Sequence, residues 1–183
     1  MSSKTLVVYF SRRGSNYFNG SIQNLSIGNT EIVASKIQNL VKSNLVHIET
    51  VFPYPEDYTE TTEVAKNEFK GNARPLLVAV INDISSYDTI YLGYPNWWNT
   101  MPMAVFTFLE SYDFSGKIII PFCTHEGSGM GNSEKDIQKL CPMATVLPGL
   151  ALYGSHVDQS DKELESWLKN LDMLNQIDVR RGS

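Results

Sequence analysis

The stretch Thr5-Leu6-Val7-Val8-Tyr9-Phe10 is an unbroken apolar run, rich in β-branched and aromatic side chains. Such a run is typical of a strand buried on both faces, which is the usual situation in a parallel sheet. Thr89–Tyr94 and Lys117–Cys123 repeat the pattern further along the chain, and Ala144–Tyr153 is expected to form another strand. Val46–Val51 alternates with period two instead, which indicates an outer strand.

Helix-like segments separate these strands. In the first of them, apolar residues recur at helical spacing from Ile32 to Val41, and Asn29 or Thr30 can cap its start. The other helices are expected near Tyr58–Lys70, over Met103–Leu109 with Pro102 in the first turn, near Ser133–Leu140, and over Leu164–Leu171 behind a cap at Asp158 or Ser160. This alternation predicts a doubly wound α/β fold, a five-stranded parallel sheet with helices on both faces.

Length and charge narrow the class of protein. The chain has 183 residues and a formal net charge of -5, so we expect a single domain over residues 1–183, with a polar tail from about residue 177. The acidic balance argues against nucleic acid and membrane surfaces as partners. No apolar run approaches the length of a membrane span, and we expect a cytoplasmic protein with two buried, unpaired thiols, Cys123 and Cys141.

The loop after the first strand is the first place to look for a ligand, because doubly wound sheets bind ligands at the carboxyl ends of their strands. It starts Ser11-Arg12-Arg13-Gly14-Ser15-Asn16 and ends Gly28-Asn29-Thr30 at a helix start. Backbone N–H groups at a helix N-terminus, with hydroxyls nearby, suit a phosphate. An ordinary polar loop is the alternative. Neither GxxxxGK[ST] nor GxGxxG is present, so a P-loop NTPase and a dinucleotide fingerprint are not supported.

The loop after Thr89–Tyr94 contains two adjacent tryptophans, Trp97 and Trp98. Neighbouring side chains point in different directions, so both are hard to place in one core. One interpretation is an aromatic platform that stacks on a flat heteroaromatic ring. The alternative is that one tryptophan packs on a helix while the other is half exposed. This loop alone leaves both interpretations open.

The loop after Lys117–Cys123 reads Thr124-His125-Glu126-Gly127-Ser128-Gly129-Met130-Gly131-Asn132. Its glycines let the backbone present N–H and C=O groups to a ligand, as the edge of a pyrimidine-like ring requires. His125 and Glu126 are candidates for an acid–base pair, but no nucleophile is partnered with them. A single histidine in a loop is more often a hydrogen-bonding residue than a catalyst, so that role stays open for His125. His47 and His156 lie elsewhere in the sequence, so no metal cluster is expected.

Taken together, the three loops resemble the flavodoxin family. More closely, they resemble the bacterial branch whose members carry VVYFSR, GNTE, GYPxWWxxMPM and PFCTHEGSG. These motifs stand here at Val7–Arg12, Gly28–Glu31, Gly93–Met103 and Pro121–Gly129. The resemblance extends from the first strand to the last helix, which is nearly the whole chain. It implies a flavodoxin fold that binds FMN without a covalent bond.

The resemblance also implies cofactor-binding residues, and no catalytic or metal-ligating ones. Ser11, Asn29 and Thr30 correspond to the phosphate loop, with Gly28 beside them and Arg13 as a further phosphate or ring candidate. The loops on the two sides of the ring correspond to Pro95, Asn96, Trp97, Trp98 and Asn99, and to Thr124, His125, Glu126, Gly127, Ser128 and Gly129. One departure is an insertion over Ser15–Ile27, where simple flavodoxins go directly to the helix. It either folds back over the ribityl chain or phosphate, with Asn16 among the contacts, or bulges into solvent.

The function implied by the resemblance is that of a monomeric FMN electron-transfer protein with redox proteins as partners. An NAD(P)H-dependent quinone or flavin reductase on the same fold is the alternative, with His125, Glu126 and Tyr17 lining a nicotinamide pocket. A flavin-free interaction module is the third possibility. A response-regulator domain would need an acidic cluster after the first strand, where this chain has Ser11-Arg12-Arg13.

Overall fold

The computed structural model describes residues 4–79 and 81–181. Within them, a six-stranded sheet is formed by β1 (Thr5–Tyr9), β4 (Asn44–His47), β5 (Thr89–Pro95), β6 (Ile118–His125), β7 (Thr145–Val146) and β8 (Leu150–Tyr153). The strand order is β4-β1-β5-β6-β7, β8 also pairs with β6, and every pair is parallel. The order therefore switches direction between β1 and β5. This arrangement confirms the predicted doubly wound sheet.

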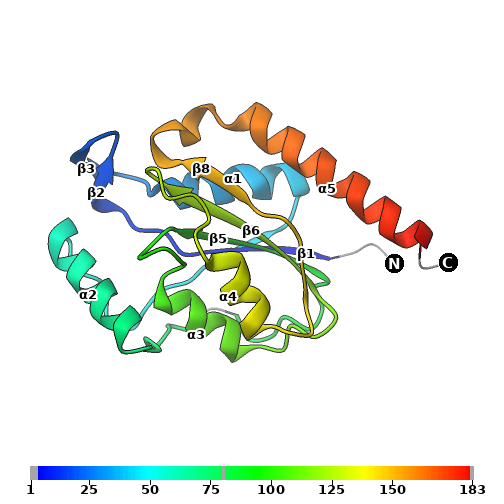
Figure 1. Cartoon of the computed structure of the whole chain (residues 1–183), viewed down its shortest axis with the longest axis horizontal. Coiled ribbons are helices and arrows are strands. Elements are labelled where there is room, and N and C mark those ends of the chain that lie inside the picture. Colours follow the sequence, from blue (N-terminus) through cyan, green and yellow to red (C-terminus); the bar gives the residue numbers. More distant parts are fainter. Residues whose placement is uncertain (1–3, 80, 182–183) are drawn as a thin grey trace.

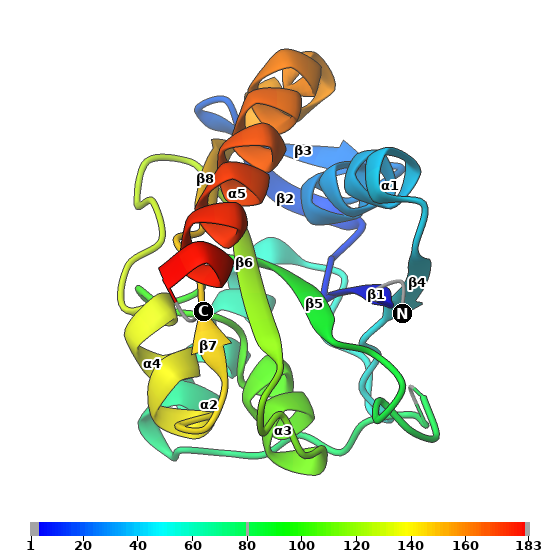
Figure 2. The ribbon, with the colours of Figure 1, turned by 90° about the vertical axis from the view of Figure 1, so that its right-hand side faces the viewer.

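Helices cover both faces of the sheet. α1 (Asn29–Val41) and α5 (Asp161–Arg181) lie above it in Figures 1 and 2, and α3 (Met103–Ser111) and α4 (Ser133–Leu140) lie below it. α2 (Tyr58–Lys70) packs at the end where β1 finishes, and the short 3-10 helix η1 (Gly154–Gln159) joins β8 to α5. Among the described residues, no helix combines the length and apolar character needed to cross a membrane.

Strand alternation divides the core into two layers. Leu6 and Val8 of β1 pack with α3 and α4 on one face, whereas Val7 and Tyr9 pack with α1 and α5 on the other. Both sets are buried, as the unbroken apolar run predicts. Cys123 and Cys141 are buried and free, which confirms the predicted pair of thiols. The strand registers, with Tyr9 opposite Gly93 and Pro95 opposite Thr124, bring the carboxyl ends of β1, β5 and β6 to one edge.

Two predicted strands have different bounds in the structure. The segment Ala144–Tyr153 contains two short strands, β7 and β8, because Pro148 lacks an N–H for the ladder and Gly149 lies close to the Pro121 carbonyl. The predicted outer strand Val46–Val51 is β4, which begins at Asn44 and ends at His47. After it, Thr50 turns away from β1 and forms an antiparallel bridge with Leu77.

The helix starts also differ in detail from the predicted caps. Asn29 and Thr30 do not cap α1, because they lie in its first turn and Gly28 occupies the N-cap position. The cap is supplied from far away in sequence, since Ser11 Oγ accepts a hydrogen bond from the Glu31 N–H at 3.1 Å. Pro102 is the residue before α3 rather than part of its first turn.

At the C-terminal end of the chain, Ser160 directly precedes α5, whereas Asp158 lies within η1. The Ser160 hydroxyl donates to the Val157 carbonyl at 2.7 Å. The predicted polar tail is helical as far as Arg181, and residues 182–183 lie outside the described part of the chain.

The insertion after β1 folds as a β-hairpin. β2 (Gly14–Phe18) and β3 (Ser21–Leu25) pair antiparallel with each other and form a separate two-stranded sheet. Asn19 and Gly20 at its tip have φ values of 48° and 86°, the left-handed conformations that a tight Asn-Gly turn requires. The hairpin stands above α2 at the left of Figure 1, at the carboxyl end of β1, so the insertion folds back over this edge of the sheet.

Candidate cofactor site

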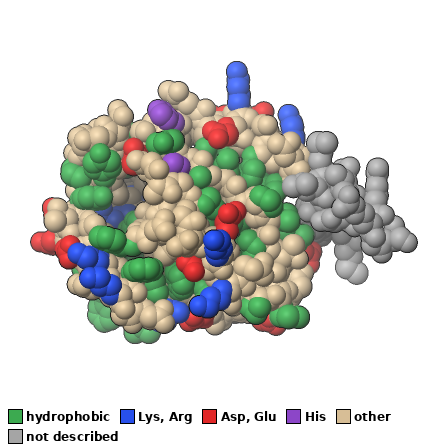
Figure 3. All heavy atoms as spheres, viewed as in Figure 1, with side chains coloured by type: hydrophobic (Ala, Val, Ile, Leu, Met, Phe, Trp, Pro, Cys, Tyr) green, Lys and Arg blue, Asp and Glu red, His purple; other side chains and the backbone are tan. Residues whose placement is uncertain are grey.

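A cavity of about 310 Å³ lies at the carboxyl edge of the sheet, and all three predicted loops contribute to it. Ligand pockets of small-molecule sites start at about 300 Å³. Its walls are Ser11, Arg12, Asn16, Tyr17, Asn29, Thr30, Tyr58, Pro95, Asn96, Trp97, Thr124, His125, Glu126 and Ser128. The space-filling view shows a recess at the left of the molecule, between the hairpin and α2 (Figure 3).

The N-terminus of α1 forms one end of the cavity. The Thr30 hydroxyl is buried and lies 2.7 Å from the Thr124 hydroxyl, which joins the first loop to the third. N–H groups in the first turn of a helix have no acceptor within the helix, and the helix dipole adds a partial positive charge there. This end of the cavity therefore has the donors that a phosphate requires.

Gly28 allows the two separated halves of the first loop to meet. A Cβ atom at this position would lie 2.1 Å from Ser11 Oγ and 2.7 Å from the Arg12 carbonyl oxygen. Only glycine fits such a close backbone approach. The residues before and after the hairpin thus form one surface, although the insertion separates them in sequence.

A tight turn shapes the tryptophan loop. Trp97 and Thr100 exchange two backbone hydrogen bonds, at 2.8 and 3.2 Å. Between them, Trp98 and Asn99 have φ values of 52° and 67°. A bulky residue in this left-handed region costs about 1–3 kcal/mol and persists where its surroundings fix it, commonly at ligand sites. Asn96 provides part of that support: its Nδ2 donates to the Gly129 carbonyl at 2.8 Å, and its Oδ1 accepts from the Asn99 N–H at 3.1 Å.

The two tryptophans have different surroundings. Trp97 is partly buried and packs edge-on against Phe10 and Tyr54, with ring centroids 5.3 and 5.0 Å apart, while it lines the cavity. Trp98 is 41% exposed, donates from Nε1 to the Thr62 carbonyl at 3.2 Å and lies under the Lys66 ammonium. Trp98 is therefore held against α2, outside the cavity wall, and Trp97 is the one available to a ligand in it.

The third loop presents a neutral imidazole. His125 Nδ1 accepts a hydrogen bond from the Gly127 N–H at 2.8 Å, so its ring proton resides on Nε2. Burial lowers the His125 pKa from its usual value, against the opposing charge of Glu126. The imidazole packs against the Tyr153 ring with centroids 4.6 Å apart and the two planes tilted by 52°. At neutral pH it is a hydrogen-bond donor at the cavity wall rather than a cation.

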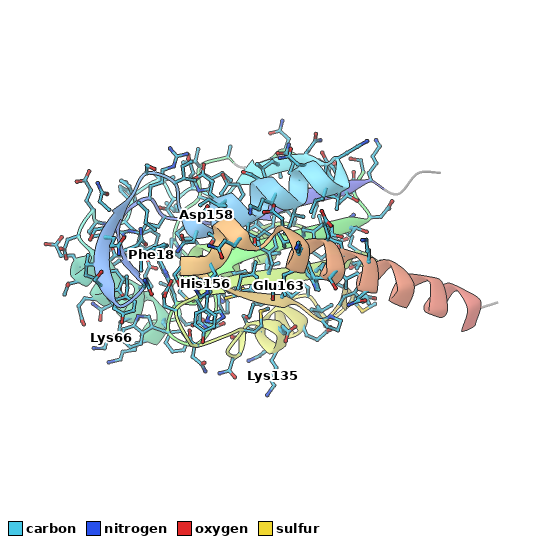
Figure 4. The ribbon with its side chains drawn as sticks, turned by 90° about the horizontal axis from the view of Figure 1, so that it is seen from above. Phe18, Lys66, Lys135, His156, Asp158 and Glu163 are labelled. Carbon is cyan, nitrogen blue, oxygen red and sulfur yellow. The ribbon has the colours of Figure 1, made fainter. Side chains whose placement is uncertain are left out.

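Glu126 connects three segments around the cavity. One carboxylate oxygen accepts from the Ser155 N–H of η1 at 2.9 Å, and the other accepts from the Asn19 N–H at the tip of the hairpin at 3.3 Å. Phe18 and His156, labelled in Figure 4, mark the two segments that it joins. With both oxygens engaged, Glu126 holds the hairpin in place.

The two adjacent arginines of the first loop, Arg12 and Arg13, have different hydrogen-bond partners. Arg13 pairs with Glu31 through two hydrogen bonds, Nε at 3.0 Å and Nη2 at 2.6 Å, and its side chain is 65% exposed. Arg12 is partly buried at the cavity wall and donates to the backbone carbonyls of Ser15, Pro55 and Glu56. The Arg12 side chain thus anchors the hairpin to the segment that precedes α2.

The structure brings most of the predicted residues together and leaves some out. Of the predicted set, Arg13, Gly28, Trp98, Asn99, Gly127 and Gly129 do not line the cavity, although Gly28, Asn99 and Gly129 support residues that do. Arg12 and Tyr58 line it and were not predicted. Arg12 stands inside the motif at Val7–Arg12, so the motif itself pointed to it. Tyr58 gave no sequence signal, because its place depends on where α2 packs.

The donor set fits an FMN molecule. The cavity wall offers a helix N-terminus and hydroxyls, which suit a phosphate, and an aromatic ring with backbone and amide groups, which suit a flat heterocycle. Among the described residues, no cluster of side chains suits a metal ion.

Comparisons with known proteins agree with this assignment. A family model described as Flavodoxin matches residues 4–171. A candidate flavoprotein from Bacteroides eggerthii is 29% identical, with a TM-score of 0.72, covering 92% of this chain and 97% of that one. A second, from Bacteroides uniformis, is 30% identical, with a TM-score of 0.70, covering 92% and 99%.

A flavoprotein from Lactobacillus acidophilus, solved in complex with FMN, is 22% identical, with a TM-score of 0.62, covering 86% of this chain and 98% of that one. No curated protein sequence matches the chain. The match of the family model over nearly the whole chain shows that this protein belongs to the flavodoxin family.

Proposed function

We propose that the protein binds FMN without a covalent bond and transfers electrons. The observation that carries this proposal is the convergence of three loops, far apart in sequence, on one cavity at the carboxyl edge of the sheet. That edge is where doubly wound sheets bind their ligands. Membership of the flavodoxin family, and the FMN complex of the similar Lactobacillus acidophilus protein, support FMN as the cofactor.

Each wall of the cavity has a role in this proposal. Ser11, Thr30 and the α1 N-terminus bind the phosphate, and Asn16 and Tyr17 of the hairpin cover the chain that links phosphate and ring. Trp97 lies against the ring, and the third loop hydrogen-bonds to the edge of the ring. FMN supplies the redox chemistry when bound, while the protein orients it and excludes water.

The proposed partners are redox proteins. The net charge of -5 favours partners with basic faces, because opposite charges accelerate encounter. We propose that the chain acts as one domain and as a monomer in the cytoplasm, where Cys123 and Cys141 remain reduced.

The visible spectrum of the purified protein tests the cofactor. We expect the purified protein to show the absorption bands of oxidised flavin. After the flavin has been removed, the apoprotein should quench the fluorescence of added FMN in proportion to the amount of protein. A colourless protein that does not quench FMN would contradict the proposal. Photoreduction followed by EPR tests the electron-transfer role, for which an organic radical signal is expected, and its absence would exclude one-electron transfer.

A second hollow favours a reductase activity as the alternative function. It has a volume of about 260 Å³ and lies between α2 and the tryptophan loop. It shares Arg12, Asn16, Tyr58, Asn96 and Trp97 with the first cavity and extends to Trp98, Thr62 and Ala65. This hollow offers room for a second flat molecule beside the flavin. Oxidation of NADPH or NADH by the holoprotein with a quinone acceptor distinguishes the two functions, since a pure carrier shows no sustained turnover.

A further inference from the structure

Two adjacent arginines at the phosphate loop differ in whether a carboxylate neutralises them. Arg13 is paired with Glu31 and is largely exposed. Arg12 does not take part in any ion pair among the described residues, and its acceptors are backbone carbonyls: Ser15, Pro55 at 2.6 Å, Glu56 at 2.5 Å and Asp57 at 3.4 Å. Carbonyls orient a guanidinium but do not cancel its charge.

The position of Arg12 makes that charge available to a ligand. Arg12 directly follows Ser11, which caps α1, and both residues line the cavity together with Asn29 and Thr30. The Nη1 and Nη2 atoms of Arg12 donate to backbone carbonyls. Its Nε–H donates to no other described residue, so this donor is available to a ligand. Burial also lowers the Arg12 pKa from its usual value, because the guanidinium has lost part of its water. It nevertheless stays protonated at neutral pH.

The Asp57 carboxylate attracts this cation without forming an ion pair, but burial has the larger effect on the Arg12 pKa, so the charge is only partly compensated. An anion bound beside such a cation offsets the remaining cost of its burial. The flavin proposed for this cavity contains one group that is a dianion at neutral pH, its phosphate. Glu31 is the acidic side chain of the first turn of α1, and it is already neutralised by Arg13. Arg12 is therefore a cation of the cavity wall, next in sequence to the α1 cap Ser11, that no ion pair among the described residues neutralises.

We propose that Arg12 is the charged group that makes this site select a phosphorylated ligand, and so distinguishes FMN from riboflavin, which lacks the phosphate. The inference rests on the proposed FMN site and deepens it. It prefers Arg12 to Arg13, the phosphate candidate predicted from the sequence, because Arg13 is paired with Glu31 and is not among the residues that line the cavity.

Two binding titrations test the proposal, with FMN and with riboflavin as separate ligands of the apoprotein, followed by flavin fluorescence. In the wild type, FMN should bind more tightly than riboflavin. Arg12→Gln should weaken FMN binding by about tenfold or more, as expected for loss of a charge-assisted hydrogen bond, and should change riboflavin binding less than about threefold. Arg12→Lys keeps the charge and should recover part of the FMN affinity. The double variant Arg13→Gln, Glu31→Gln removes the neighbouring ion pair as a whole and should leave the ratio of the two affinities unchanged.

If Arg12→Gln weakened FMN and riboflavin equally, Arg12 would only anchor the hairpin, and the proposal would be overturned. The proposal would also be overturned if Arg12→Gln changed neither affinity. Both results leave the FMN site itself intact.

Inorganic phosphate separates failure of this inference from failure of the proposed function. Phosphate should raise the melting temperature of the wild-type apoprotein and of the double variant Arg13→Gln, Glu31→Gln, relative to chloride at equal ionic strength, but not that of Arg12→Gln. One possible result is that no flavin binds but phosphate still stabilises the protein only when Arg12 is present. That result would contradict the proposed FMN function and would support Arg12 as part of a phosphate site. Stabilisation that is the same in all three proteins would overturn the inference.

Discussion

The residues of the tryptophan loop differ in what their side chains already contact. Trp97 is held edge-on by Phe10 and Tyr54 and faces the cavity, whereas Trp98 is engaged by Thr62 and Lys66 outside it. We therefore expect Trp97→Ala to weaken FMN binding about two- to tenfold, the equivalent of the ~0.5–1.5 kcal/mol that an aromatic contact adds. Trp98→Ala, the matched neighbour, should change it less than twofold. Fluorescence titration of the two apoproteins measures both effects, and a larger loss for Trp98→Ala would reverse the assignment.

His125 makes the stability of the protein depend on pH. Its pKa is lowered by burial, so the unfolded chain takes up a proton near its ordinary pKa of about 6.5, while the folded protein does so only at lower pH. Between these two pKa values the unfolded state binds more protons, and the free energy of unfolding therefore decreases as the pH falls. Protonation of Nδ1 also breaks its bond from the Gly127 N–H.

Urea unfolding of the wild type and of His125→Asn, at several pH values between 7.5 and 5, checks this expectation. The asparagine keeps an acceptor close to the position of Nδ1 but does not titrate, so its stability should change less over this interval. Equal pH dependence in the two proteins would show that other groups are responsible.

At the scale of elements, the hairpin is separable from the sheet. β2 and β3 hydrogen-bond only to each other within the described ladders, and β3 is largely exposed. Gly28 already lies against the Arg12 carbonyl, so the chain can close without the hairpin. Deletion of residues 14–27, which joins Arg13 to Gly28, should therefore preserve cooperative unfolding and the circular dichroism of the α/β core.

The same deletion should affect the bound flavin, because it removes Asn16 and Tyr17 from the cavity wall. We expect faster release of FMN and stronger quenching of its fluorescence by iodide. Ile22→Ser, which changes a side chain that is 52% exposed, retains the hairpin and is the control. Unchanged iodide access after the deletion would mean that the hairpin does not cover the flavin.

At the scale of the whole molecule, the two thiols report on global unfolding. Cys123 and Cys141 are 1% and 5% exposed and belong to the same core layer. Burial raises the pKa of Cys123 to about 12 and that of Cys141 to about 11, so neither forms a reactive thiolate at neutral pH. We expect the native protein to resist a thiol reagent such as DTNB, and both thiols to react once urea has unfolded it. Fast reaction of either thiol in the folded state would reveal local opening of the core.

The α/β architecture was predictable because β1, β5 and β6 are buried on both faces, and such strands leave long apolar runs in the sequence. The hairpin was not predicted, although Asn19-Gly20 is a strong local signal for a tight turn. The split of the last strand into β7 and β8 depends on the close packing of Gly149 against Pro121, a contact between distant residues. The hydrophobic pattern of the sequence therefore predicted the strands and helices of the central α/β core, but not the hairpin or the exact ends of the last strands.

The sequence by itself determined the order of strands and helices, the acidic charge, and three loops whose residues suit a phosphorylated flavin. These properties follow from composition and from short periodic patterns, which are local. Only the tertiary structure decided that Arg12 rather than Arg13 faces the cavity, and that Trp97 rather than Trp98 lines it. Adjacent side chains point in different directions, and their partners, Glu31, Pro55, Tyr54 and Lys66, are brought to them by packing of distant segments.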